Sequence, residues 1–91
     1  MVSKDISFKN RDRLIQLGIA IGTLRKMRGM SQEKLAEVSG VSRSLISVIE
    51  APNVAKSFSL DIFFSLCDAL EVAPEDLISA SVFPDRVTRR K

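Results

Sequence analysis

Histidine is absent from this sequence of 91 residues, and cysteine occurs only once, as Cys67. The commonest general base and metal ligand is therefore missing, and one thiol can form neither an internal disulfide nor a thiolate cluster. We therefore expect a protein that is not an enzyme and that holds no metal ion and no cofactor. Because Cys67 falls within an apolar run, we interpret it as a core residue in a reducing compartment rather than as a reactive thiol.

Long apolar segments are absent as well. The sequence contains no run of about 18 consecutive apolar residues, which a membrane-spanning helix needs, and its N-terminus has no apolar stretch of signal-peptide length. We therefore expect a cytoplasmic protein that makes no membrane contact. The length predicts one domain with one modest core, and a hydrophobic content of 45% is ordinary for a globular protein.

The formal net charge is only +3, but it is unevenly distributed along the chain. Residues 1–30 carry a net charge of +5, residues 31–58 are balanced, residues 59–85 hold six acids and no base, and residues 86–91 add four positive charges. A surface with one basic side and one acidic side suits a protein that places one face on phosphates. Without a motif, an ordinary solvated surface accounts for the same charges equally well.

The centre of the chain, residues 31–50 (SQEKLAEVSGVSRSLISVIE), predicts two short helices joined by a glycine turn. Ser31 is placed to cap a helix over residues 32–38, and Gly40 is expected to end that helix as a left-handed residue. The apolar positions of this helix are Leu35, Ala36 and Val38.

The second of the two helices is predicted from Ser42, its N-cap, to Glu50. Apolar residues recur in it at helical spacing, so Ile46 and Ile49 are expected to face inward. The other face carries Arg43, Ser44, Ser47 and Val48. Cap, helix, glycine turn, cap and helix together form the unit that places its second helix in the major groove of DNA.

An apolar stripe before this unit predicts a first helix over residues 11–28, with Asn10 as its N-cap. The stripe consists of Leu14, Leu17, Ile21 and Leu24. Gly18 and Gly22 lie inside the same helix, and each costs up to about 1 kcal/mol relative to alanine. We therefore expect them at a close crossing with another helix.

After Glu50, Pro52 is expected to end the helix, and Asn53 to take the left-handed conformation that favours glycine. Ser59 is a plausible cap for a fourth helix with an unusually wide apolar face. This face either crosses the middle of the core or leaves Phe64 and its neighbours for a dimer contact. We favour core filling, because most of the aromatic residues lie in this part of the chain.

Pro74 predicts the start of a fifth helix, which Pro84 would stop. The sequence therefore predicts an all-α fold of five helices. We expect its domain over residues 11–83, between a flexible N-terminal arm of residues 1–10 and a basic C-terminal tail of residues 84–91.

Five parts of the chain match one known pattern. They are Arg25, residues 31–36 (SQEKLA), residues 40–42 (GVS), residues 46–50 (ISVIE) and residues 69–72 (ALEV). The pattern resembles the lambda-repressor and Cro-like, or xenobiotic-response-element (XRE), family of helix-turn-helix transcriptional regulators. The resemblance covers residues 17–78. It implies a compact five-helix domain whose second and third helices form the helix-turn-helix.

The resemblance also implies roles for residues that contact DNA. Gln32 and Ser42 would bond phosphates and set the register, while Arg43 and Ser44 would reach base edges. Arginine most often reads guanine through its O6 and N7 atoms, so Arg43 is the leading base reader. For Arg43, and for Ser44 and Ser47 on the same helix, the alternative is an ordinary solvated side chain.

Further positions in the resemblance are less typical of the family. Ser47 and Val48 lie one turn further along the helix, and the family often has a longer polar residue in place of Val48. That valine would touch a thymine methyl group or leave its base unread. Lys56 remains as the strong phosphate contact in a loop that is longer and less basic than usual. Arg25 and Glu50 would pair across the fold, unless they are independent surface charges.

The leading hypothesis is a sequence-specific regulator of double-stranded DNA, most simply a repressor that occludes a promoter. One recognition helix buries too little surface for a stable specific complex, so we expect a homodimer on a pseudo-palindromic operator, with recognition helices about 34 Å apart. Val82 and Phe83, with any uncovered part of the fourth helix, are candidates for self-association, unless this end of the domain frays. The alternative is an antitoxin-type module that binds and neutralises a partner toxin while autoregulating its operon.

Overall fold

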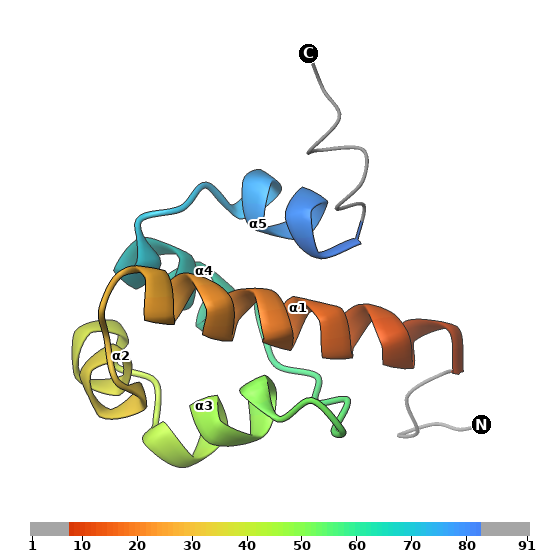
Figure 1. Ribbon diagram of the computed structural model, residues 1–91, viewed down its shortest axis with the longest axis horizontal. Helices are drawn as coiled ribbons and strands as arrows, with labels where there is room; N and C mark the ends of the chain where they lie inside the picture. Colours follow the sequence, from red (N-terminus) through yellow and green to blue (C-terminus); the bar gives the residue numbers. More distant parts are fainter. Residues whose placement is uncertain (1–7, 83–91) are drawn as a thin grey trace.

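The computed structural model describes residues 8–82, which form five α-helices and no strand. The helices are α1 (Phe8–Met27), α2 (Gln32–Ser39), α3 (Arg43–Glu50), α4 (Leu60–Leu70) and α5 (Pro74–Val82). The predicted all-α fold is therefore confirmed. Helix α1 crosses the middle of the molecule with α5 on one side and α3 on the other, while α2 and α4 lie near its C-terminal end (Figure 1). None of the helices in the described range has the length and apolar character needed to span a membrane.

Helix α1 begins at Phe8, earlier than the predicted start at residue 11. Asn10 consequently lies inside the helix, and its prediction as an N-cap is wrong. Lys9 and Asn10 each disfavour a helix by less than about 1 kcal/mol relative to alanine, so neither residue stops it. Residues 8–10 thus belong to α1, while the rest of the predicted arm, the basic tail and Phe83 lie outside the described residues.

Serine caps begin three of the helices, as predicted. The hydroxyl oxygens of Ser31, Ser42 and Ser59 each accept a hydrogen bond of 3.0 to 3.1 Å from the backbone N–H three residues further on. Each bond satisfies a donor that has no partner within the first turn of a helix. Gly40 ends α2 with a φ of 78°, the left-handed conformation that the sequence predicts there.

The end of α3 differs from the prediction. Within residues 8–82, Asn53 does not have the expected positive φ, because Glu71 is the only non-glycine residue that does. Helix α3 ends instead through Ala51, which is extended with a φ of −65° and a ψ of 124°. Because the residue before Pro52 is restricted to extended geometry, the chain leaves the helix at Ala51, and Asn53 need not turn it.

A left-handed glutamate ends α4, which the sequence did not predict. Glu71 has a φ of 57°, a conformation that disfavours side chains with a Cβ. Arg28, just after α1, donates from Nε to the carbonyl oxygen of Leu70 at 2.8 Å and from Nη2 to that of Glu71 at 3.4 Å. A cation from a distant part of the chain thereby satisfies carbonyls at this helix end.

The hydrophobic core gathers side chains from all five helices and from the turn between α2 and α3. Its buried members are Leu17, Ile21, Leu35, Val41, Ile46, Ile49, Phe63, Leu66, Cys67, Leu70 and Leu77. Cys67 is fully buried, and desolvation, followed by the charge of Asp68, raises the pKa of its thiol. The thiol therefore remains neutral, which agrees with its interpretation as a core residue.

Three large apolar side chains of α2 and α4 are exposed. Val38 on α2 is 52% exposed, and Leu60 and Phe64 on α4 are 69% and 47% exposed. Leu60 and Phe64 are one turn apart and share the outer face of α4, whereas the buried residues of that helix lie on the opposite face. Core filling therefore accounts for one side of α4 only, and the expectation that it accounts for Phe64 is wrong.

Candidate nucleic-acid interface

Helix α3 lies at an outer edge of the molecule, with no other described helix beyond it (Figure 1). Its inner side is formed by Ile46 and Ile49, which are buried in the core, with Leu45 partly buried beside them. The four side chains exposed on its outer side are those of Arg43, Ser44, Ser47 and Val48. The structure thus brings together on one surface all the predicted contacts of this helix.

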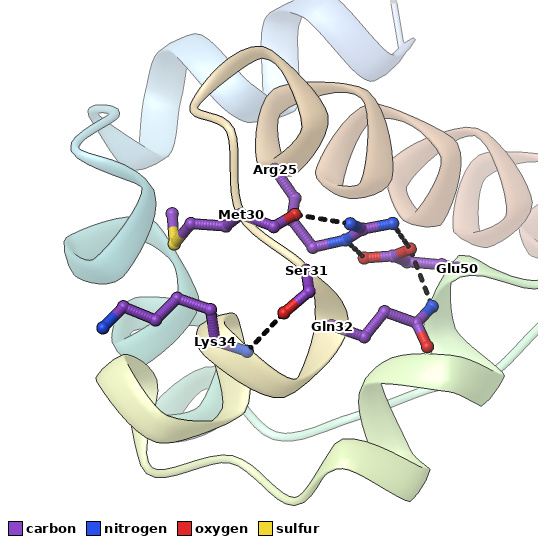
Figure 2. Close-up of polar contacts among 6 residues, drawn as sticks. All are labelled: Arg25, Met30, Ser31, Gln32, Lys34 and Glu50. Carbon is purple, nitrogen blue, oxygen red and sulfur yellow. Dashed lines mark hydrogen bonds and ion pairs between the residues drawn. The ribbon is translucent and has the colours of Figure 1, made fainter.

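A buried ion pair fixes the C-terminal end of α3 to α1 (Figure 2). Arg25 donates from Nε to Oε2 of Glu50 and from Nη2 to Oε1, both at 2.8 Å. Its third nitrogen, Nη1, donates to the carbonyl oxygen of Met30 at 2.7 Å. Gln32 completes the group, because its Nε2 donates to Oε1 of Glu50 at 3.0 Å. One cluster therefore connects α1, the turn after it, the start of α2 and the end of α3.

The pair is almost removed from solvent, with 9% and 8% of the Arg25 and Glu50 side chains exposed. The hydrogen bonds to Glu50 raise the pKa of Arg25 above its ordinary value, against an opposing effect of burial. Desolvation offsets much of the attraction in such a pair, so its main physical effect is to specify geometry. Here that geometry is the orientation of α3 relative to α1.

Two glycines of α1 allow α3 to approach closely. A Cβ on Gly18 would overlap the backbone carbonyl oxygen of Ile49, and a Cβ on Gly22 would lie 3.1 Å from the carboxylate of Glu50. The predicted close crossing at these glycines is therefore present, and its partner is the C-terminal end of α3. At Gly18 an added side chain would meet the backbone of α3, whereas at Gly22 it would meet only the movable end of the Glu50 side chain.

Arg43, the predicted base reader, forms an ion pair within the molecule. Its Nε lies 2.9 Å from Oε2 of Glu33, in the first turn of α2, and the two side chains are 54% and 68% exposed. Sequence reasoning missed this contact because the two residues are ten positions apart on different helices, a spacing that carries no local signal. Opposite charges on the two facing first turns are the only hint that the sequence offers.

The predicted phosphate contacts occupy three different places. Gln32 is partly buried, and its side-chain amide bonds the carboxylate of Glu50 at the end of α3. The hydroxyl of Ser42 caps α3 and lies 3.5 Å from that of Ser44. Lys56 is exposed on the loop between α3 and α4, and it makes no ion pair with any residue of the described range.

Comparison with known proteins finds one family and related folds. A family model described as helix-turn-helix matches residues 21–77. The chain is similar to the restriction-modification controller protein C.AhdI from Aeromonas hydrophila, with 34% identity and a TM-score of 0.65 over 70% of this chain and 94% of that one. A mutant of the controller protein C.Esp1396I shares the fold, with 23% identity and a TM-score of 0.70 over 96% of this chain and 100% of that one. Among curated proteins, none matches the sequence.

Proposed function

The chain belongs to the XRE-type helix-turn-helix family, and on that premise we propose that it is a sequence-specific DNA-binding transcriptional regulator that inserts α3 into the major groove. The observation that carries the proposal is the outer face of α3, where Arg43 stands among small side chains that leave room for base edges. The opposite side of the helix is packed into the core and tied to α1 by Arg25 and Glu50. A rigid helix with an open outer face is the arrangement that groove reading requires.

Each exposed residue has a chemical part in this proposal. The guanidinium of Arg43 donates two hydrogen bonds to O6 and N7 of a guanine, and the Ser44 hydroxyl bonds a neighbouring base edge. Ser47 and Val48 lie one turn further on, and Val48, which is 39% exposed, touches a thymine methyl group. Gln32, Ser42 and Lys56 bond phosphates and set the register, without selecting a sequence.

The regulator acts as a homodimer in this proposal, because one helix of eight residues buries too little surface for a stable specific complex. Two apolar surfaces outside α3 support self-association. Leu60 and Phe64 are exposed on α4, and an apolar groove of about 500 Å³ lies between α1 and α5, where Met27 is 70% exposed. A second copy of the chain covering such surfaces would remove apolar area from water.

In this proposal the protein represses transcription, because a dimer bound across a promoter blocks access to the promoter without any additional domain. Likeness to C.AhdI, a restriction-modification controller, supports a role in controlling an operon of that kind. A second candidate is an antitoxin-type module that binds a partner toxin. The apolar, partly exposed Val48 on the proposed reading face favours that candidate, since its side chain can donate no hydrogen bond to a base.

A binding titration tests the proposed function. A duplex is first selected from a randomised library with the wild-type protein, and its affinity is compared with that of a scrambled duplex at two salt concentrations. A dimer with about 6 to 10 phosphate contacts loses about 10³ to 10⁵ in affinity between 50 and 200 mM salt. Arg43→Ala is expected to weaken binding to the selected duplex by about 1 to 3 kcal/mol and to relax the preference for one base pair in each half-site.

Lys56→Ala serves as the matched control for Arg43→Ala. It removes one exposed cation that the proposal places on a phosphate, so it is expected to weaken binding to the selected and scrambled duplexes alike. Equal losses on both duplexes from Arg43→Ala would show that Arg43 does not read a base. An affinity that hardly changes with salt would reject DNA binding and favour the protein-interaction module.

A further inference from the structure

The side chain of Arg43 is met by a carboxylate within its own chain. Oε2 of Glu33 lies 2.9 Å from Nε of Arg43, so the ion pair joins the first turn of α2 to the first turn of α3. Within the described residues, this is the one polar contact of the Arg43 guanidinium. The carboxylate approaches the nitrogen nearest the aliphatic stem, and the outer edge with Nη1 and Nη2 keeps its hydrogen-bond donors for another partner.

We propose that Glu33 is a specificity-determining residue, which orients Arg43 toward a guanine and opposes its attachment to phosphates. The inference rests on the proposed DNA-binding function and adds to it a residue of α2 that reads no base itself. Glu33 acts in this account through Arg43, by position and by charge.

Two physical effects give Glu33 this role. An unpaired arginine samples many rotamers, and its charge is drawn to nearby phosphates whatever the sequence. The ion pair with Glu33 restricts those rotamers and places a negative charge where a phosphate would otherwise approach. A guanine is still accepted, because O6 and N7 can take their hydrogen bonds from the outer edge of the guanidinium. Binding to random sequence is thereby weakened more than binding to the matching site.

The exposure of the pair makes this effect separable from folding. With the side chains of Arg43 and Glu33 54% and 68% exposed, solvent screens their attraction, and an exposed pair of this kind contributes little to stability. Removing Glu33 should therefore leave the melting temperature unchanged while altering DNA binding. The charge of Glu33 also helps to raise the pKa of Arg25, but it is the smallest of the effects on that pKa.

Helix α2 offers a matched control. Glu37 lies on the same helix and pairs with Lys34, whose Nζ is 3.8 Å from its Oε1. Glu37→Gln removes the same charge from the same helix as Glu33→Gln, but it does not touch Arg43. Any difference between the two variants then reports the contact with Arg43 and not the change in net charge.

The test measures the affinities of wild type, Glu33→Gln and Glu37→Gln for the selected and the scrambled duplex. Glu33→Gln is expected to bind the scrambled duplex about threefold more tightly and to lose about fivefold in the ratio of selected to scrambled affinity. Glu37→Gln should change both affinities alike and keep the ratio within about twofold. In an Arg43→Ala background, Glu33→Gln should leave the ratio unchanged, because the residue that it orients is gone.

An unchanged ratio in Glu33→Gln, or an equal fall in Glu37→Gln, overturns the proposal. A fall in the ratio that persists in the Arg43→Ala background overturns it too, since Glu33 would then act without Arg43. Failure of the proposed function has a different signature. In that case the wild-type protein enriches no sequence from the library, and this result is known before any variant of Glu33 is measured.

Discussion

Arg25 uses every polar group of its side chain within one buried cluster. Its three nitrogens bond both oxygens of Glu50 and the carbonyl of Met30, and Gln32 bonds the same carboxylate. Loss of either charged partner would leave the other charge buried and unpaired. The resulting loss of folding stability is larger than the net stability that the intact pair contributes. The two charges therefore act as one unit that couples the stability of the domain to the orientation of α3.

Arg25→Met is expected to lower the free energy of unfolding by about 3 to 5 kcal/mol, because it leaves the carboxylate of Glu50 buried and unpaired. The double variant Arg25→Met with Glu50→Leu should recover a large part of this loss, since an apolar pair of similar volume needs no partner. Urea denaturation measures both values. DNA affinity should remain low in the double variant, because no polar contact then fixes the angle of α3.

Arg13→Met is the control for Arg25→Met, because Arg13 is exposed on the same helix. Its effect on unfolding should stay within about 0.5 kcal/mol. Equal destabilisation by both arginine variants would show that the loss comes from net charge and not from the buried pair. Wild-type DNA affinity in the recovered double variant would show that the pair does not orient α3.

At the scale of elements, α1 and α3 cross closely because α1 has two glycines, which carry no side chain, at the crossing. Gly18 lies against the backbone of Ile49, and a backbone carbonyl cannot rotate away as a side chain can. Gly22 faces the end of the Glu50 side chain, which can shift by a few tenths of an ångström. The two glycines therefore differ in how much a methyl group would disturb the crossing.

Gly18→Ala is expected to destabilise the domain by about 1 to 3 kcal/mol, because the added methyl group forces α1 and α3 apart. The free-energy cost of this separation exceeds the gain of about 1 kcal/mol in helix propensity from alanine. Gly22→Ala gains the same propensity with a milder contact, so its net effect should lie within about 1 kcal/mol of zero. Thermal or urea unfolding compares the two variants. Equal stability of both would mean that the crossing at Gly18 can open without cost.

Elements whose signals are local could be predicted from the sequence. The serine caps and Gly40 act on backbone groups within a few residues, so their positions alone indicated α2, α3 and the start of α4. Signals that depend on distant residues could not be found in this way. Arg28 donates to a carbonyl oxygen at the end of α4 although it lies 42 residues away in the sequence, beside a left-handed Glu71.

The same distinction between local and distant signals applies to the candidate site. Helical spacing placed Arg43 and Ser44 on the exposed side of α3 and Ile46 on the buried side, and the motif positions of Arg25 and Glu50 indicated their pairing. The ion pair of Arg43 with Glu33 depends on the angle between two helices, which no periodicity in the sequence encodes. Whether the outer residues of α3 contact DNA stays a prediction.

For the whole molecule, the arrangement of helices separates the proposed DNA-reading face of α3 from the apolar groove proposed for self-association. Helix α3 lies on one side of α1 and α5 on the other (Figure 1), so the groove between α1 and α5 does not include the exposed face of α3. A second copy can therefore be accommodated on apolar surface that the reading helix does not use. A rigid dimer of this kind fixes the distance between its two reading helices.

That fixed distance gives a prediction about the DNA. Two reading helices about 34 Å apart match half-sites one turn apart, so inserting five base pairs between the half-sites of the selected duplex turns them to opposite faces. The expected loss of affinity is about 10²-fold or more, because only one subunit can then bind its half-site at a time. The same five base pairs inserted outside the half-sites should change nothing. Gel-shift titration measures the affinity for the selected duplex and for the two with insertions, and sedimentation of the free protein measures its oligomeric state. Equal affinity for all three duplexes would mean that the chain binds DNA as independent single subunits.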